Sequence, residues 1–205
     1  MDYFLLLLLW TCWCALHSLL ISEGVVRKME VRLGKNYRYY RLAFNIFAFL
    51  TLLPLIAYGR SLHSIPVFQW QGLPVVIQAI SFLAAVCFFL AGAAKYDLDQ
   101  FLGLAQIKSG KTNLVMTEDG RLDTSGILQV TRHPWYIGGI LILWSYQQEI
   151  DLQSFLTNMV LSLYFIVGAF LEERKLLVKF GTEYRNYQKQ VSMFFPFKWL
   201  RNRFH

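Results

Sequence analysis

Long apolar stretches separated by short polar segments dominate the pattern of the chain. Four of them reach or approach the length of a membrane span, at residues 3–21, 42–58, 73–94 and 155–171. A helix needs about 20 apolar residues to cross ~30 Å of hydrocarbon, and about 17 is the lower limit. A fifth stretch, at residues 135–146, would give a helix only about 18 Å long. We therefore expect it either to extend through residues 147–149 or to form one arm of a helical hairpin with residues 155–171.

After the last apolar stretch the pattern becomes amphipathic. It predicts a short helix at residues 171–180 that ends at Gly181, and a second helix that is capped by Thr182 and continues to about Val191. Tyr184, Tyr187 and Val191 would share one face of the second helix. The following residues Phe194, Phe195, Phe197 and Trp199, around Pro196, are typical of an aromatic anchor at a membrane interface.

Together these elements predict an all-α membrane protein. We expect five transmembrane helices, the last two as a helical hairpin, followed by cytoplasmic amphipathic C-terminal helices. The chain has no internal repeat and no linker, so residues 1–205 are predicted to form a single domain. Met1-Asp2-Tyr3 lacks the basic start of a signal peptide, and we expect the first segment to be a retained transmembrane helix.

Composition and charge support this membrane interpretation. Only 16% of the residues are charged and 56% are hydrophobic. With five crossings and the amino terminus outside, the cytoplasmic segments would contain 19 of the 20 Lys and Arg residues, and Arg60 would be the exception. The charge pattern thus predicts a multi-pass protein of a bacterial-type inner membrane with a cytoplasmic carboxyl terminus. The lipid bilayer explains the net charge of +7, so we expect neither a nucleic-acid partner nor an obligate protein partner.

The first candidate site is the segment from Arg132 to Tyr136, at the start of the short apolar stretch. Pro134 suits the first turn of a helix, whose amides and positive dipole end favour an anion. Arg132 adds a cation, and Trp135 or Tyr136 offers a ring face to a positive ligand. A cofactor that carries a carboxylate, a sulfonium and an aromatic base would suit these groups. The alternative is an interfacial belt in which Arg132 only reaches toward the surface.

The second candidate site is Glu172-Glu173, where the last predicted span leaves the membrane. Carboxylates at this position could bind a ribose diol or an ammonium group. The alternative is a solvated charge cluster with the neighbouring basic residues, which would contribute little.

Three polar residues inside predicted spans form a third candidate. His17 and Ser18 lie near the end of the first span, and Asn45 lies near the start of the second. Polar groups within a bilayer are functional candidates, although they also serve as hydrogen bonds between helices. By contrast, the chain has no Rossmann or Walker motif and no His/Cys cluster with metal spacing, so we expect no metal site and no Rossmann-type enzyme.

Two runs of residues resemble a known family. The first run consists of Thr124-Ser125-Gly126-Ile127 and Arg132-His133-Pro134-x-Tyr136-x-Gly138. The second consists of Glu172-Glu173-Arg174, Phe180-Gly181-x-x-Tyr184-x-x-Tyr187 and Pro196. Both are similar to the isoprenylcysteine carboxyl methyltransferase superfamily. Within it, the chain is most similar to methanethiol S-methyltransferases and the related NnrU family. This narrower match depends on three segments: Leu16-His17-Ser18, the run from Tyr96 to Leu104, and Gln190-Val191-Ser192-Met193. The likeness covers most of the chain from about Leu16.

The resemblance implies a cytoplasm-facing pocket for S-adenosylmethionine, with S-adenosylhomocysteine as the product. By this resemblance, the cofactor contacts would be Leu122, Asp123 and Leu128 from a preceding loop, then His133, Pro134, Trp135 and Tyr136, and finally Glu172. The two candidate sites add Arg132 and Glu173 as cofactor contacts. Two positions differ from the family. Leu128 stands where an aromatic residue is common, and Gly168 lies near the position of an arginine that binds substrate in the isoprenylcysteine enzymes. The missing arginine argues against a prenylated cysteine as the substrate.

We therefore expect methyl transfer to a small lipophilic nucleophile, most simply a thiol. Arg132 and the helix start at Pro134 would hold the methionyl carboxylate, Glu172 the ribose, and His17 would accept the proton, oriented by Asn45 or Ser18. Two alternatives stay open. Sterol-reductase-like membrane proteins share a similar carboxyl-terminal pattern and bind NADPH, but Trp135 and Gly139 replace their typical residues. The NnrU likeness also permits a non-catalytic assembly factor for nitrogen-oxide respiration.

Overall fold

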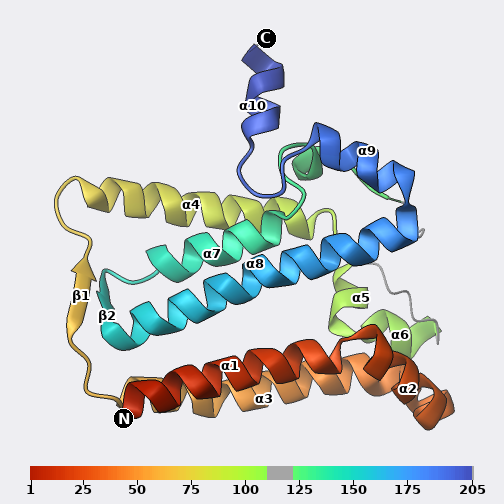
Figure 1. The fold of residues 1–205 in the computed structure, drawn as a ribbon, viewed down its shortest axis with the longest axis horizontal. Helices are drawn as coiled ribbons and strands as arrows, with labels where there is room; N and C mark the ends of the chain where they lie inside the picture. Colours follow the sequence, from red (N-terminus) through yellow and green to blue (C-terminus); the bar gives the residue numbers. More distant parts are fainter. Residues whose placement is uncertain (110–121, 205) are drawn as a thin grey trace. The chain divides into compact units, whose positions relative to one another are not determined.

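The computed structural model describes residues 1–109 and 122–204 and consists mainly of helices (Figure 1). Four described segments are long and apolar enough to cross a membrane: Asp2–Leu20, Glu23–Ser61, Pro74–Ala93 and Leu152–Phe180. They confirm the expected helical membrane fold and match the four long apolar stretches of the sequence. The shorter apolar helix Pro134–Ser145 matches the fifth stretch. The number of complete crossings and the side on which each terminus lies stay predictions.

The described residues form two compact units, and each is considered by itself. The first unit contains residues 1–65, 97–109 and 151–160, and the second contains residues 66–96, 122–150 and 161–204. Helix α8 (Leu152–Phe180) contributes its beginning to the first unit and its remainder to the second. The single domain expected over residues 1–205 stays a prediction.

The first unit is built around the contact between α1 (Asp2–Leu20) and α3 (Tyr40–Ser61), with α2 (Glu23–Leu33) and the 3-10 helix η1 (Gly34–Tyr39) between them in sequence. Leu6, Trp10 and Cys14 of α1 are buried, and their spacing of four residues places them on one face of the helix. A Cβ at Gly59 of α3 would lie 3.5 Å from the Leu6 side chain. The two helices therefore approach closely where α3 has no side chain.

Two short helices, α5 (Leu98–Leu102) and α6 (Leu104–Ser109), complete the described part of the first unit. The Asp97 side chain caps α5 by accepting a hydrogen bond from the amide of Gln100. Gly103 joins the two helices with a φ of +90°, and a Cβ there would lie 2.6 Å from the backbone nitrogen of Leu42. Only glycine fits this position, both for its conformation and for its contact with α3.

In the second unit, α4 (Pro74–Ala93) and α7 (Pro134–Ser145) pack side by side (Figure 1). Their contact uses small residues. A Cβ at Gly138 would lie 3.2 Å from the Phe89 ring, and a Cβ at Gly92 would lie 2.4 Å from the Trp135 ring. Such positions allow helix backbones to approach within a bilayer, where hydrophobic burial does not drive helices together.

The short helix α7 ends at Ser145 and does not extend through residues 147–149. The buried side chain of Gln78 donates to the carbonyls of Ser145 at 3.0 Å and Gln147 at 2.8 Å, which satisfies groups that the helix end leaves open. The chain then enters strand β2 (Glu149–Asp151), which pairs with β1 (Pro66–Gln69). This two-stranded sheet was not predicted, because three or four residues are too few to show a strand pattern.

Helices α7 and α8 pack as the arms of a hairpin, which is one of the two arrangements that the sequence allowed. The Trp144 indole donates to the Ser162 hydroxyl at 3.0 Å. A Cβ at Gly139 would lie 2.7 Å from the Phe165 ring. In the hairpin, α8 covers one side of α7, an apolar helix of only 12 residues.

The carboxyl-terminal part differs from the prediction at two points. Helix α8 continues without a break to Phe180, so the separate helix expected at residues 171–180 was wrong, because those residues form helix as readily as the preceding span. Gly181 ends α8 with a φ of +54° and is itself the N-cap of α9 (Thr182–Gln190), so the cap predicted at Thr182 was wrong. Helix α10 (Phe197–Phe204) follows.

Tyr184 and Tyr187 share the buried face of α9, as predicted, and Val191 is buried directly after the helix ends. With Leu128 they form a buried apolar cluster between α9 and the loop that precedes α7. This cluster places the loop, the start of α7 and the end of α8 next to one another.

Candidate functional site

Hydrogen bonds to the chain after α9 hold the segment that precedes α7. Thr131 forms a parallel bridge with Ser192, and the amide of Arg132 donates to the Ser192 carbonyl at 3.1 Å. The Thr131 hydroxyl donates to the Met193 carbonyl at 2.9 Å. His133 then caps α7, and Pro134 is its first residue, as the sequence predicted.

Arg132 and Glu173 form a buried ion pair with two parallel contacts. Arg132 Nε lies 2.6 Å from Glu173 Oε1, and Nη2 lies 2.9 Å from Oε2. The two side chains are only 7% and 9% exposed. The remaining guanidinium nitrogen donates to the carbonyls of Gln188 and Val191. Because all three nitrogens of Arg132 bind protein groups, its geometry favours a positioning role over contact with a ligand.

Glu173 also accepts hydrogen bonds from three other side chains. His133 Nε2 lies 3.1 Å from Oε1, the Tyr184 hydroxyl donates to Oε1 at 2.8 Å, and Gln188 Nε2 donates to Oε2 at 2.5 Å. We call Glu173 with Arg132, His133, Tyr184 and Gln188 the Glu173 hub. A buried carboxylate needs such partners, since an unpaired one would cost several kcal/mol. The hub joins the start of α7, the end of α8 and α9.

His133 lies between Glu173 and a second, more accessible carboxylate, that of Glu172. Its Nδ1 atom lies 3.8 Å from Glu172 Oε2, and the Glu172 side chain is 30% exposed. Tyr136 lies within reach of the charge of Glu172, and its ring meets the His133 ring edge-on at 5.3 Å. Burial and the charge of Glu172 raise the pKa of Tyr96 above its ordinary value, which keeps that hydroxyl protonated. We call Glu172, His133, Tyr136 and Tyr96 the Glu172 cluster.

Trp135 forms the aromatic border of the Glu172 cluster. Its indole donates to the Phe89 carbonyl at 3.1 Å, and its ring meets the Tyr96 ring at 4.8 Å in a T-shaped arrangement. Gly92 leaves the space that the indole occupies. The cluster therefore has rings on the α4 side and a carboxylate on the α8 side.

The loop before α7 contains the other three predicted cofactor residues. Leu128 lies in the buried cluster with α9, and Leu122 packs against that cluster. Asp123 accepts hydrogen bonds from the amide and hydroxyl of Ser125 and forms an ion pair with Lys95 at 3.2 Å. Burial raises the pKa of Asp123, but the hydrogen bonds from Ser125 and Lys95 lower it more, so it lies below its ordinary value.

Beside this loop, the second unit has a hollow of about 250 Å³. It is lined by Thr124, Gln129, Tyr187, Gln190, Val191 and Trp199. Neither His133 nor Glu172 lines it. The structure thus links Arg132, Glu173, His133, Glu172 and Tyr136 in one group. Leu122, Asp123 and Leu128 instead belong to the loop packed on α9. Their roles as cofactor contacts stay predictions.

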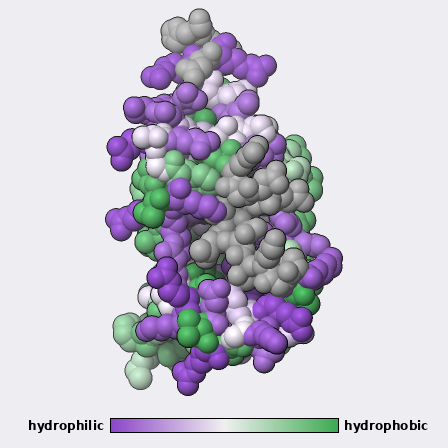
Figure 2. All heavy atoms as spheres, turned by 90° about the vertical axis from the view of Figure 1, so that its right-hand side faces the viewer, coloured by the Kyte–Doolittle hydropathy of each residue, from purple (hydrophilic) through white to green (hydrophobic). Residues whose placement is uncertain are grey.

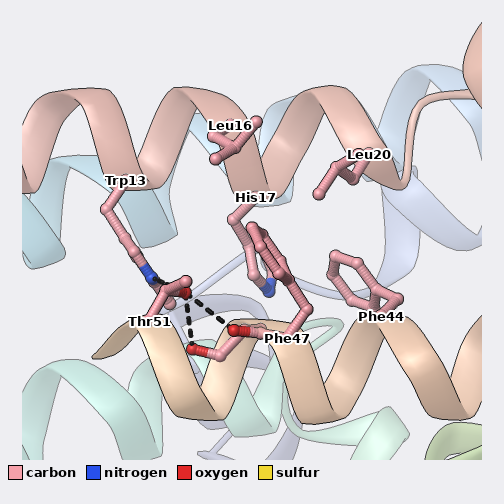
Figure 3. A pocket seen from close by; sticks show the side chains of 8 residues that line it. Trp13, Leu16, His17, Leu20, Phe44, Phe47 and Thr51 are labelled. Carbon is pink, nitrogen blue, oxygen red and sulfur yellow. Dashed lines mark hydrogen bonds between the residues drawn. The ribbon is translucent and has the colours of Figure 1, made fainter. Parts of the chain in front are cut away.

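His17 belongs to the first unit, where aromatic rings surround it. Figure 3 shows its side chain pointing from α1 toward α3. Its ring stacks on Trp13 at 5.1 Å and lies 4.9 Å from the Phe44 ring. It lines a hollow of about 10 Å³, which is close to the space that one water molecule needs. A larger molecule would have to displace a side chain there.

Asn45 also belongs to the first unit but binds another element. Its amide nitrogen donates to the carbonyls of Phe101 and Leu102, both at 3.1 Å, at the end of α5. Arg41 Nε donates to the same Phe101 carbonyl at 3.2 Å. Asn45 therefore holds α5 against α3, and this contact favours a structural role over the predicted orientation of His17.

Four site residues were missed in the sequence as carriers of chemistry. Tyr184 and Gln188 complete the Glu173 hub, Tyr96 joins the Glu172 cluster, and Lys95 holds Asp123. Tyr96 occurred only as part of a family motif, and Tyr184 occurred in a motif and on the shared face of the predicted second helix. A polar residue on the buried face of an amphipathic helix was the available signal for Tyr184.

Gly168 of α8 borders the same region. A Cβ there would lie 3.2 Å from the Tyr136 ring and 3.6 Å from its hydroxyl. A larger side chain at this position would press on Tyr136, so the glycine preserves the arrangement of the Glu172 cluster.

Comparisons with known proteins find similarity to the NnrU family and to methyltransferases. Residues 5–200 match the sequence model of the family described as NnrU protein. Methanethiol S-methyltransferase 1 of Bradyrhizobium diazoefficiens is 32% identical over 162 residues, which cover 77% of this chain and 55% of that protein. Methanethiol S-methyltransferase of Pseudomonas deceptionensis is 35% identical over 78 residues, which cover 38% of this chain and 29% of that protein. In the first of these matches, the chain spans about half the length of its relative. No solved structure matches.

Proposed function

The chain belongs to the NnrU family, and from that premise we propose that it is a membrane methyltransferase that uses S-adenosylmethionine to methylate a small lipophilic thiol. The names of its relatives support a thiol as the acceptor. The observation that carries the proposal is the Glu172 cluster, in which a partly exposed carboxylate lies beside a buried histidine and a half-buried tyrosine at the start of α7.

The chemistry of the Glu172 cluster fits the methyl donor. When bound, S-adenosylmethionine supplies a methyl group on a positively charged sulfur. Glu172 would accept hydrogen bonds from the ribose diol or the ammonium group. The rings of Tyr96, Trp135 and Tyr136 would face the sulfonium, since aromatic faces attract cations. The start of α7 at Pro134 would receive the methionyl carboxylate.

Within this proposal, the Glu173 hub positions the residues that contact the donor. Arg132 and Glu173 bind each other, so we assign both to holding His133 and the start of α7 in place. His133 joins hub and cluster because its two ring nitrogens face the two carboxylates. Leu122, Asp123 and Leu128 would form the loop that covers the donor.

The acceptor side of the reaction is assigned to the first unit. A thiol reacts as its thiolate, so its proton must be accepted. We propose that His17 accepts it, and we no longer assign Asn45 to orienting this histidine. The lipophilic thiol would enter from the bilayer of a bacterial-type inner membrane. The charge pattern supports a cytoplasmic carboxyl terminus and an external amino terminus.

Binding of labelled S-adenosylmethionine to the purified protein tests the proposal. We expect saturable binding that Glu172→Gln weakens roughly 10- to 100-fold, the effect of losing a charge-assisted hydrogen bond. Glu183→Gln is the matched control, because Glu183 is an exposed carboxylate on α9. Equal binding by both variants would contradict the assignment of Glu172.

The same assay separates the alternative functions. Binding of NADPH alone would replace the proposal with a sterol-reductase-like enzyme. Binding of neither nucleotide would favour a non-catalytic assembly factor for nitrogen-oxide respiration. With the donor bound, mass spectrometry of reactions offered thiols, phenols and carboxylates would identify the methyl acceptor, and we expect the thioether product.

A further inference from the structure

Helix α10 presents apolar side chains that the described protein leaves uncovered. Phe197 is 70% exposed and Leu200 is 40% exposed, and Phe195 just before the helix is 69% exposed. Phe197 and Leu200 are three residues apart and therefore share a face of the helix. Exposed aromatic and aliphatic side chains gathered on one short segment indicate a surface that meets another phase or molecule.

The other side of α10 is attached to the protein. Lys198 Nζ donates to the Gln188 carbonyl at 2.7 Å, and the backbone amide of Lys198 donates to the Ser192 hydroxyl at 3.1 Å. Trp199 lines the hollow beside α9. These contacts fix which face of α10 turns outward.

The exposed apolar side chains have basic neighbours. Arg201 and Arg203 are both exposed, and the Arg203 guanidinium lies 5.0 Å from the centre of the Trp199 ring. Over α9 and α10, hydrophilic side chains dominate the face drawn in Figure 2. Within the second unit, α10 runs across the direction of α4, α7 and α8 (Figure 1). A helix that crosses the spanning direction in this way would lie along the membrane surface.

We propose that α10 and Phe195 dock on a membrane surface containing anionic lipids. Phe195, Phe197 and Leu200 enter the boundary between headgroups and acyl chains, and Arg201 and Arg203 bind the lipid phosphates. Basic amphipathic helices with aromatic residues bind anionic membrane surfaces in this manner. The bilayer is the favoured occupant because the apolar helices of the same unit already place it beside α10. The proposal is independent of methyl transfer.

Spin labels on the full-length protein in lipid nanodiscs test the docking. Labels are introduced as Phe197→Cys and Leu200→Cys, with Arg185→Cys on α9 as the exposed control. Cys12, Cys14 and Cys87 are first replaced by alanine so that only the introduced cysteine reacts. Power saturation then compares collisions with oxygen, which enriches in lipid, and with a water-soluble nickel complex.

In nanodiscs that contain phosphatidylglycerol, we expect labels at positions 197 and 200 to collide often with oxygen and rarely with the nickel complex. The label at position 185 should show the opposite. Labels at 197 and 200 that meet nickel as often as the control would overturn the docking. Labels shielded from both reagents would also overturn it, because they would lie against a second copy or another protein.

Charge reversal tests the lipid headgroup. The double variant Arg201→Glu with Arg203→Glu should raise the nickel accessibility of the label at position 197 in phosphatidylglycerol nanodiscs. The same variant should change little in nanodiscs of phosphatidylcholine alone. An equal change in both lipids would overturn the anionic part of the proposal.

Discussion

Two histidines of this chain lie in opposite kinds of surroundings. His17 in the first unit stacks on Trp13 and is tilted against the Phe44 ring, beside a hollow of about 10 Å³. His133 in the second unit lies between the carboxylates of Glu172 and Glu173. The sequence ranked both as candidate site residues; His133 belongs to a network of polar side chains, and aromatic rings pack against His17.

The difference shows how each histidine can act. Aromatic rings of α1 and α3 pack against the His17 ring. A hydrogen bond of 3.1 Å holds Nε2 of His133 against Glu173, and Nδ1 faces Glu172 at 3.8 Å. We therefore assign donor binding and its support to the second unit, and only the acceptance of a proton to the first.

The largest effect should come from breaking the Glu173 hub. Glu173→Gln would leave the Arg132 guanidinium buried without a charged partner, and we expect a loss of about 3–5 kcal/mol in the free energy of unfolding. Reversible unfolding in detergent with increasing denaturing surfactant would measure it. Glu172→Gln is the control, because its carboxylate is partly exposed and should cost far less. Equal stability of the two variants would show that the hub does not support the fold.

His17→Phe should separate packing from chemistry in the first unit. Phenylalanine keeps a ring between Trp13 and Phe44, so the fold should persist. Without the proton acceptor, we expect thiol methylation near neutral pH to fall about 100-fold, the lower range for a general base. Activity should recover as the pH rises, because the thiol then ionises in solution. A variant with unchanged turnover at all pH values would remove His17 from the mechanism.

Two tyrosines of α9 offer a finer comparison. Tyr184 donates to Glu173, whereas Tyr187 donates to the Leu128 carbonyl. Each Tyr→Phe change should cost about 1 kcal/mol in stability, the usual contribution of one hydrogen bond. Only Tyr184→Phe should also weaken donor binding through the hub, measured as the dissociation constant for S-adenosylmethionine. Similar binding losses in both variants would contradict a specific role of the hub.

The smallest effect is expected at the loop that Asp123 anchors. Asp123→Asn removes the ion pair with Lys95, which is partly exposed and worth at most about 1 kcal/mol. Amide exchange at Ser125 should become faster in the variant at neutral pH. Because the pKa of Asp123 is lowered, the wild-type contact should persist at neutral pH and be lost as the pH falls through that lowered pKa. No difference between the proteins at neutral pH would show that Asp123 does not anchor the loop.

The helices were predictable because membrane spans follow directly from local hydropathy. Residues 3–21 and 73–94 differ by only one residue at each end from α1 and α4. The helix start at Pro134 and the break at Gly181 follow from the backbone preferences of single residues. The strands β1 and β2 were not predicted, because each is short and pairs with a distant segment.

The side-chain partners were harder to predict than the elements. Arg132 and Glu173 were both chosen from the sequence, but as separate contacts to a ligand. Their pairing depends on α8 continuing past residue 171 and on α9 folding back against it. Such contacts between residues about forty positions apart are set by packing, which the hydropathy pattern does not contain. Asn45 illustrates the same point, since its partners lie at the end of α5.

The most direct test of the account is to locate the bound methyl donor on the protein. Labelled S-adenosylmethionine would be photocrosslinked to the purified full-length chain, and the modified peptides identified by mass spectrometry. The account predicts adducts at Tyr96, at residues 133–136 or at Glu172, and their loss in Glu172→Gln but not in Glu183→Gln. Adducts confined to residues 1–65, or equally strong in both variants, would contradict it.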